Sequence, residues 1–350
     1  MSIRLRTDRG PGPTPRWLLI VFCLLPLAAS CTRQYLVSDA GPQSYYQTGF
    51  PIRDTSGELE RIVQSVHRIG VTAFYTTYRF AREDSVTESA ARDPRTLERA
   101  REQYTFDHSK AGTASILALD ERGVTLLTNH HVTRTPDTLI VHFRDVRGVT
   151  DPGRPVESIS IRISQQSYLF GLPGRAPFRV VAADSGIDLA LIRADLPGAD
   201  RWPGLRVLRT SMGDASRLAW GSFVYVIGYP RGYRMVTRGI VSDPGYAEDD
   251  AFLLDGLFNR GISGGIILAV RGDTGALEWV GIARGSAAQT EYRLMPESRD
   301  AIEEGLLLPY EGQLYMELGS RIEYGVTFPV PMTAIRRFLQ STRYESITRE

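Results

Sequence analysis

The chain has little lysine, little cysteine and almost no net charge. Lys110 is the only lysine among 41 basic residues, and the formal net charge at pH 7 is +1. A chain without a basic excess does not attract polyanions, so nothing in the composition indicates nucleic acid as a partner. The hydrophobic content of 42% and the charged content of 23% are typical of a folded globular protein.

The scarcity of cysteine excludes a disulfide framework. The chain contains only Cys23 and Cys31. Cys23 lies in an N-terminal segment that we expect to be removed, so no intramolecular disulfide can form in the mature chain. The adjacent His130 and His131 have no cysteine or third histidine at ligand spacing, so the sequence predicts no metal site and no cofactor.

The apolar segment near the N-terminus is too short to be a comfortable membrane span. It runs from Trp17 to Ala29 and follows four arginines, as the apolar core of a secretory signal peptide does. We therefore predict a signal peptide over residues 1–30 and export to the cell envelope. The segment ends Leu27-Ala28-Ala29-Ser30-Cys31, which resembles the lipobox of bacterial lipoproteins.

The lipobox resemblance predicts a lipid anchor. In that class the cysteine is lipidated and becomes the new N-terminus, so Cys31 would hold the protein on a membrane, in the periplasm or as an outer-membrane-associated lipoprotein. Ordinary cleavage after Ala28, which would leave Cys31 as a free thiol, is the alternative. Residues 31–55 carry Gly, Pro, Ser, Gln and Tyr without a clear period and are interpreted as a tether.

Residues 56–345 are predicted to form an all-β domain with a short helix near each end. Gly57–Val66 and Met332–Leu339 place apolar residues at helical spacing. Between them, short apolar runs alternate with turn residues, which is typical of a β-barrel or sandwich. The expected strands are Val71–Phe80, Ser115–Leu119, Val124–Thr128, Leu139–Phe143, Ile159–Ile163, Phe178–Val181, Leu189–Ile192, Phe223–Ile227, Gly239–Val241, Ile266–Val270, Trp279–Ala283 and Gly325–Val330.

Two stretches break this pattern. Residues from about 81 to 110 are charged and mostly polar, and we interpret them as a solvated insertion with an exposed helix over Pro94–Glu102. The pattern also weakens from about 286 to 321, which predicts a second surface excursion.

A serine between glycines is the strongest chemical signal in the chain. Gly261-Ile262-Ser263-Gly264-Gly265 precedes an apolar run, as expected of a nucleophile at a tight turn before a buried strand. Acyl transfer at neutral pH needs such a nucleophile together with an imidazole base, a carboxylate that orients the imidazole, and an oxyanion site. A glycine at position 261 can turn its N–H toward the developing charge, and the N–H of Ser263 is the expected second donor.

More than one residue can supply the base and the acid. His130 and His131 are adjacent, so only one of them can face the serine. Asp184 and Asp188 both precede a strand, and Asp188 leads directly into it. The other histidines are interpreted as surface or packing residues: His67, His108 and His142.

Three ordered blocks together resemble the trypsin-like serine proteases, and most closely their bacterial HtrA/DegP-type branch. Thr128-Asn129-His130-His131-Val132 resembles the family's Thr-Asn-x-His-Val block, and Asp188-Leu189-Ala190 resembles its Asp-Leu-Ala block. Phe258-Asn259-Arg260-Gly261-Ile262-Ser263-Gly264-Gly265 resembles its Ile-Asn-Pro-Gly-Asn-Ser-Gly-Gly block. The resemblance assigns the base to His131, the acid to Asp188 and the nucleophile to Ser263. A PDZ domain, which these proteins often carry, is not expected.

The resemblance implies two β-barrels with the site between them, protein or peptide substrates, and an oxyanion hole at Gly261 and Ser263. It also implies a pocket for the residue before the cleaved bond, for which we expect small or medium apolar residues. Arg284, beside this pocket, is expected to favour an acidic neighbour in the substrate. The pocket residues are Leu257, Phe258, Ile282, Ala283 and Arg284.

The glycine-flanked block departs from the family pattern at three positions. Ile262 replaces Asn or Asp, Arg260 replaces Pro, and Ile266 stands where Pro usually follows. These changes motivate a second hypothesis, in which the domain is catalytically inactive and serves as a binding or scaffold module in the cell envelope. Gly261-Ile262-Ser263-Gly264-Gly265 also fits the Gly-x-Ser-x-Gly pattern of α/β-hydrolase esterases, but that fold needs the order Ser, Asp, His, which is absent because every histidine precedes Ser263.

Overall fold

The computed structural model describes residues 44–51, 53–143, 153–172, 174–247, 249–256, 258–284, 286–296 and 314–342. The predicted signal peptide and the lipidation site Cys31 lie outside these residues, as does the predicted pocket residue Leu257. No helix of the described residues is long and apolar enough to cross a membrane.

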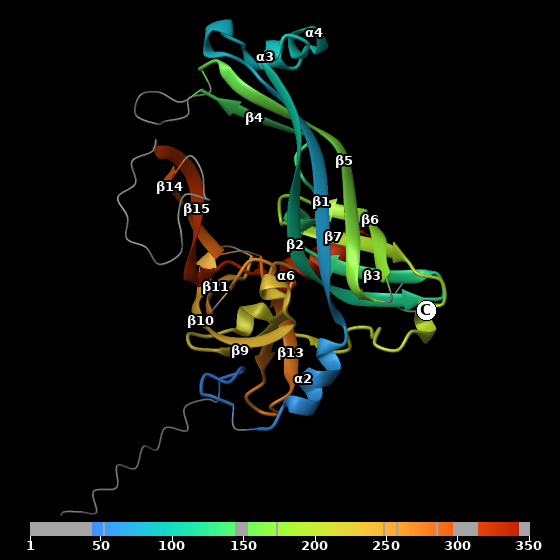
Figure 1. The fold of residues 1–350 in the computed structure, drawn as a ribbon. Helices are drawn as coiled ribbons and strands as arrows, with labels where there is room; N and C mark the ends of the chain where they lie inside the picture. The colour runs from blue at the N-terminus through green and yellow to red at the C-terminus, as the bar shows by residue number, and fades with distance from the viewer. Residues whose placement is uncertain are drawn as a thin grey trace, which may run out of the picture. The chain divides into compact units, whose positions relative to one another are not determined.

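The first of two β-sheets closes into a barrel (Figure 1). Its strand order is β1-β2-β3-β7-β6-β5-β4, and β1 also pairs with β5, so six of the seven strands form a closed ring. The strands are β1 (Val66–Arg79), β2 (Glu102–Asp120), β3 (Gly123–Thr128), β4 (Thr138–His142), β5 (Val156–Leu172), β6 (Gly174–Asp184) and β7 (Leu189–Asp195).

The second sheet has nine strands. Eight follow the order β14-β15-β11-β10-β9-β12-β13-β16, and β8 pairs with β13. The strands are β8 (Ser211–Met212), β9 (Phe223–Gly228), β10 (Met235–Ala247), β11 (Ala251–Gly256), β12 (Ile266–Val270), β13 (Leu277–Ile282), β14 (Ser286–Pro296), β15 (Leu314–Thr327) and β16 (Val330–Pro331). Two sheets with few helices confirm the predicted all-β, trypsin-like fold class.

Short helices flank the sheets, as predicted. The N-terminal helix α2 (Ser56–Val63) and the C-terminal helix α6 (Met332–Ser341) match the two expected helices within a few residues. Helix α6 buries Met332, Ile335 and Phe338 in the core. The remaining helical segments are one turn each: α3 (Glu88–Ala91), α4 (Pro94–Leu97), α5 (His130–Thr133), η1 (Arg82–Asp84), η2 (Ala199–Arg201), η3 (Ala215–Arg217) and η4 (Pro230–Gly232).

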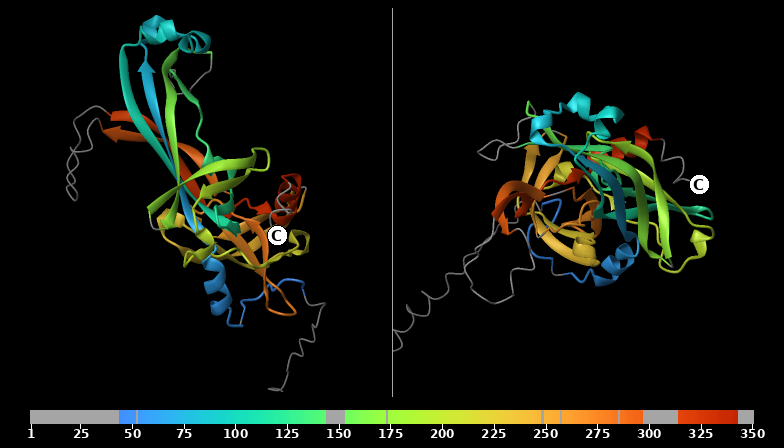
Figure 2. Two further views of the ribbon diagram at one scale, coloured as in Figure 1. Left: turned by 90° about the vertical axis from the view of Figure 1, so that its right-hand side faces the viewer. Right: turned by 45° about the horizontal axis from the view of Figure 1, so that its top comes forward.

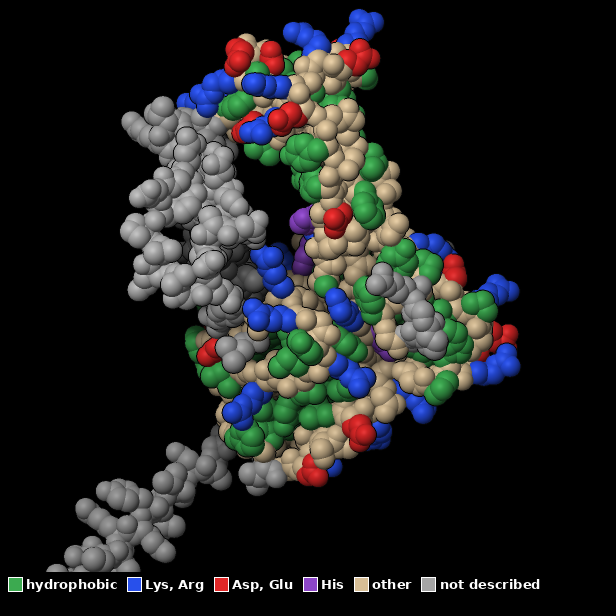
Figure 3. All heavy atoms as spheres, in the orientation of Figure 1, with side chains coloured by type: hydrophobic (Ala, Val, Ile, Leu, Met, Phe, Trp, Pro, Cys, Tyr) green, Lys and Arg blue, Asp and Glu red, His purple; other side chains and the backbone are tan. Residues whose placement is uncertain are grey.

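Strands β1, β2 and β5 continue past the barrel as a ribbon, and β4 pairs with β5 toward the tip of this ribbon (Figure 2). The ribbon ends in a small apolar cluster under α3 and α4, over which Figure 3 shows charged side chains gathered. The exposed helix predicted over Pro94–Glu102 is wrong beyond Leu97, because Glu102 begins β2. Both faces of this part of β2 are open to solvent, so its sequence lacks the apolar alternation by which strands are recognised.

The two sheets share one hydrophobic core. Leu127 and Leu191 of the first sheet pack in the same buried cluster as Ile227 and Ile266 of the second. This shared core fixes the end of β3 and the start of β7 beside the start of β12, where the three resemblance blocks lie.

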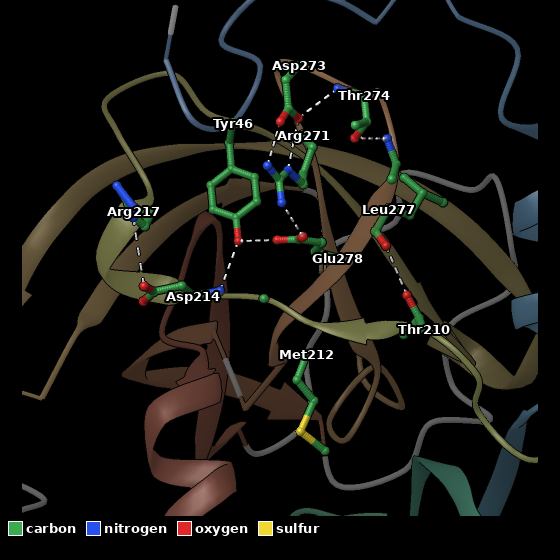
Figure 4. Close-up of polar contacts among 12 residues, drawn as sticks. Tyr46, Thr210, Met212, Asp214, Arg217, Arg271, Asp273, Thr274, Leu277 and Glu278 are labelled. Carbon is green, nitrogen blue, oxygen red and sulfur yellow. Dashed lines mark hydrogen bonds and ion pairs between the residues drawn. The ribbon is translucent and has the colours of Figure 1, made fainter.

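A buried tyrosine joins the N-terminal segment to the second sheet (Figure 4). Tyr46 is fully buried; its hydroxyl donates to Oε2 of Glu278 at 2.9 Å and accepts the N–H of Asp214 at 2.9 Å. Arg271 reaches the other oxygen of Glu278, Oε1, at 3.3 Å. Burial raises the pKa of the Tyr46 hydroxyl well above its ordinary value, so the hydroxyl stays protonated and keeps donating.

Replacing Tyr46 by phenylalanine tests this connection. Tyr46→Phe leaves the carboxylate of Glu278 and the N–H of Asp214 each without one partner, which we expect to lower the free energy of unfolding by about 1–3 kcal/mol. The measurement is urea unfolding followed by fluorescence. The matched control is Tyr45→Phe, because the Tyr45 ring packs on Tyr46 but its hydroxyl makes no hydrogen bond within the described residues. Equal stability of the two variants would contradict the interpretation.

Candidate active site

Asp188 directly precedes β7 and has a left-handed backbone conformation. Its φ is 60° and its residue surface is 8% exposed. Asp184, the alternative acid, points its carboxylate back into the turn and accepts the N–H groups of Gly186 and Ile187 at 2.8 and 3.3 Å. The carboxylate that faces the histidine block is therefore that of Asp188.

His131 is bound to Asp188 at two points. Its backbone N–H donates to Oδ1 at 2.9 Å, and its ring Nδ1 lies 2.7 Å from Oδ2. An ionised carboxylate only accepts hydrogen bonds, so Nδ1 carries the hydrogen of the neutral ring. Nε2 then keeps its lone pair and can take a proton, and the imidazole remains about half exposed.

Neighbouring groups fix the backbone that carries this pair. Asn129 donates its side-chain N–H to the carbonyl of Asp188 at 3.0 Å, and the N–H of His130 donates to the same carbonyl at 3.2 Å. Lys110 donates from Nζ to the carbonyl oxygens of His131 and Arg134, each at 3.3 Å. Burial lowers the pKa of Lys110 from its ordinary value.

The loop that carries Ser263 is anchored on β2. The N–H of Thr113 donates to the carbonyl of Ser263 at 2.8 Å, and its hydroxyl donates to the carbonyl of Gly261 at 2.8 Å. Gly264 has a φ of 87°, and a Cβ there would lie 1.9 Å from the carbonyl oxygen of Thr113. Only glycine fits this approach.

Two N–H groups beside the serine are available as donors. Gly261 has a φ of 101°, and a Cβ there would lie 2.4 Å from the carbonyl oxygen of Tyr229. Within the described part of the chain, the N–H groups of Gly261 and Ser263 donate no hydrogen bond. Unused donors next to a nucleophile are what an oxyanion site needs.

Ser263 and Val132, the residue after His131, both lie close to Gly112. A Cβ on Gly112 would lie 2.5 Å from Cγ1 of Val132, the residue after His131, and 3.2 Å from the carbonyl oxygen of Ser263. The Ser263 hydroxyl itself donates to the carbonyl of Arg284 at 3.1 Å rather than to His131.

Arg284 contacts both ends of the site. Its carbonyl accepts the serine hydroxyl, and its Nε lies 3.7 Å from Oδ2 of Asp188, the oxygen that also binds Nδ1 of His131. The Arg284 side chain is half exposed, so a ligand can reach it from solvent.

Three further predicted pocket residues are buried. Phe258 and Ala283 belong to the core of the second sheet, and Ile282 belongs to the core shared by the two sheets. None of the three is more than 1% exposed. Ile262, which departs from the family pattern, is also buried, and its Cδ1 would lie 2.8 Å from a Cβ on Gly228. An apolar residue at 262 is therefore explained by packing.

Three other histidines lie outside the pair of His131 and Asp188. His67 is buried, and its burial lowers the pKa to about 4, so it is neutral near pH 7. His142 lies 3.0 Å from the carboxylate of Glu88 beneath α3. His108 is exposed on β2. No cluster of metal-ligating side chains occurs within the residues that the structure covers.

Three positioning contacts were not predicted from the sequence. Asn129 was noted only as part of a resemblance block, and nothing in the pattern around Thr113 indicates its two contacts with the serine loop. Lys110 carries a compositional signal, since it is the only lysine in a chain rich in arginine.

The geometry agrees with the result of the family comparison. Residues 112–277 match the family model of the trypsin-like peptidase domain. The chain contains a trypsin-like peptidase domain. The trypsin-like resemblance of the sequence blocks is thereby confirmed.

Solved structures similar to the chain include two of the HtrA-type protease AlgW. The structure with a tripeptide has 17% identity and a TM-score of 0.42, and the match covers 83% of this chain and 63% of that one. The structure with a decapeptide has 19% identity and a TM-score of 0.42, and the match covers 83% of this chain and 68% of that one. No curated protein matches the chain.

Proposed function

We propose that this protein is a serine endopeptidase of the cell envelope. Ser263 attacks a peptide carbonyl while Nε2 of His131 takes the hydroxyl proton. The developing oxyanion is held by the N–H groups of Gly261 and Ser263. The proton then passes from His131 to the leaving amine, and water hydrolyses the acyl-enzyme by the same route.

The observation that carries this proposal is the two-point contact between His131 and Asp188. A carboxylate that binds both the backbone N–H and Nδ1 leaves the ring one orientation and one tautomer, with Nε2 free for proton transfer. The unused N–H groups of Gly261 and Ser263 add the second element that acyl transfer requires. The envelope location rests on the predicted signal peptide and on the predicted lipidation of Cys31.

One observation favours the alternative of an inactive binding or scaffold module. The Ser263 hydroxyl donates its hydrogen bond to the carbonyl of Arg284 and not to His131 in this arrangement. We propose that this is a resting arrangement, from which rotation about the Cα–Cβ bond of Ser263 brings the hydroxyl to Nε2. Ser263 and the residue after His131 both lie close to Gly112, which supports this interpretation.

Removing the serine hydroxyl tests the function. Ser263→Ala is expected to lower casein hydrolysis by several orders of magnitude, because the step that forms the acyl-enzyme loses its nucleophile. The matched control is Ser211→Ala, at an exposed serine of β8, which keeps the wild-type rate. Undiminished cleavage by Ser263→Ala would refute the assignment.

We also propose that Arg284 favours an acidic residue in the substrate next to the cleaved bond. The guanidinium lies at the rim of the site and already faces one carboxylate, that of Asp188. A substrate carboxylate would draw the Arg284 guanidinium away from Asp188. The carboxylate of Asp188 would then bind His131 alone.

A peptide pair that differs only in this neighbour tests the preference. Arg284→Ala is expected to reduce the ratio of kcat/KM for the acidic over the neutral peptide by about tenfold, the equivalent of one charge-assisted contact. Arg260→Ala, at an exposed arginine of the serine loop, should leave the ratio unchanged. If both variants keep the wild-type ratio, Arg284 does not cause a preference for an acidic residue in the substrate.

A further inference from the structure

The segment that carries the candidate base has few backbone partners. Residues 129–137 link β3 to β4 through the single turn of α5, and within the described residues they pair with no strand. Thr133 and Thr135 of this segment are nevertheless buried. Buried carbonyl groups need hydrogen-bond donors, so side chains from other elements must supply them.

Four side chains at the base of the ribbon supply these donors. We call them the ribbon clamp, and they come from three strands labelled in Figure 1: Tyr75 of β1, Lys110 of β2, and Arg162 and Gln165 of β5. The carbonyl oxygens that accept their hydrogen bonds are those of His131 and Arg134 from Lys110 at 3.3 Å each, Thr133 from Gln165 at 3.0 Å, Thr135 from Arg162 at 2.8 Å, and Pro136 from Tyr75 at 2.8 Å. The clamp therefore holds the carbonyl side of α5 and of the chain that follows it.

A β-bulge places both β5 members of the clamp on one face of the ribbon. Arg162 and Gln165 are three positions apart, so in a regular strand their side chains would point to opposite faces. The pairing of β5 with β1 passes from Ser164 directly to Arg162, which makes Ile163 the extra residue of a bulge. With this extra residue, both clamp side chains lie on the face that looks toward α5.

Gln165 joins the segment to the rest of the clamp. Its Oε1 accepts the N–H of Thr135 at 3.2 Å, the hydroxyl of Thr135 at 2.8 Å and one N–H of Arg162 at 2.9 Å, while its Nε2 donates to the carbonyl of Thr133. Arg162 also pairs with the carboxylate of Asp137. The clamp is thus a connected network, in which the loss of one side chain weakens the contacts of the others.

His131 is held from two sides by different groups. The Asp188 carboxylate binds its N–H and its ring, whereas Lys110 binds its carbonyl and Gln165 binds the carbonyl two residues later. Within the part of the chain that the structure describes, no clamp side chain is hydrogen-bonded to Ser263 or to the Asp188 carboxylate. The clamp can therefore act on the site only through the backbone that carries His131.

We propose that Lys110 and Gln165 are positioning residues, which hold the backbone of the His131 segment so that Nε2 stays where the serine proton must be taken. This inference rests on the proposed peptidase function. A displacement of about 1 Å of a catalytic group can lower a rate about a hundredfold, even when the mutated residue is far from the reacting atoms. Substrate binding does not involve the clamp, so the effect falls on kcat rather than on KM.

A pair of neighbouring glutamines provides a matched kinetic test in the full-length protein. Gln165→Met removes the amide that binds Thr133 and Thr135, and we expect kcat for a fluorogenic peptide to fall about tenfold or more with little change in KM. Gln166→Met is the control, because the amide of Gln166 is exposed and accepts a hydrogen bond only from the hydroxyl of Tyr168. The control should keep the wild-type kcat and KM.

Two substitutions at position 110 separate the hydrogen bonds from simple packing. Lys110→Met keeps most of the side-chain volume but removes the donor to the two carbonyls, and it should lower kcat as Gln165→Met does. Lys110→Arg keeps a charged donor and should recover most of the rate. An arginine variant as slow as the methionine variant would overturn the role of Lys110.

A spectroscopic signal of His131 tests positioning without relying on activity. The proton that Nδ1 donates to the Asp188 carboxylate should give a downfield proton resonance in protein with isotope-labelled histidine. We expect this resonance to move or broaden in Gln165→Met and in Lys110→Met and to stay unchanged in Gln166→Met. Gln165→Glu is the milder variant if Gln165→Met does not fold, because it keeps an acceptor for Thr135 and loses only the donor to Thr133.

The outcomes separate this proposal from the proposed function. Wild-type kcat together with an unchanged resonance in the Gln165 and Lys110 variants would overturn the positioning role, as would a rise in KM with kcat unchanged. If the wild-type protein cleaves neither casein nor the peptide, the peptidase function fails. The resonance then still decides whether the clamp positions His131.

Discussion

The arrangement of the site depends on the contact between His131 and Asp188. One buried carboxylate binds both the backbone N–H and the ring Nδ1 of the same histidine. Burial makes this contact valuable, because the carboxylate has few alternative donors and its removal from water must be compensated by hydrogen bonds. The left-handed backbone at Asp188 and the bond from Asn129 to the Asp188 carbonyl aim the carboxylate.

The packing of the two sheets brings the serine to this pair. Leucines at the ends of β3 and β7 share a core with the isoleucines of β9 and β12, so the histidine, aspartate and serine loops leave a common base. Thr113 then ties the serine loop to β2 with two hydrogen bonds. These contacts do not fix the Ser263 hydroxyl. It donates a hydrogen bond to the carbonyl of Arg284.

Much of this could be predicted from the sequence, and the exceptions have physical causes. Buried strands and amphipathic helices leave a periodic pattern, so the expected strands, α2 and α6 agree with the structure. The ribbon part of β2 leaves none, because both of its faces meet solvent and only pairing with β1 makes it a strand. The ion contact of Arg284 with Asp188 joins residues far apart in the sequence and has no local signal.

Labelling with a fluorophosphonate probe tests the central claim, that His131 activates Ser263, most directly. Full-length protein is incubated with the probe, and the adduct is located by peptide mass spectrometry in wild type and in His131→Ala. The account predicts an adduct on Ser263 in wild type and its loss in the variant, since the hydroxyl is a weak nucleophile without the imidazole. Wild-type protein without an adduct, or equal labelling of the two proteins, would contradict it.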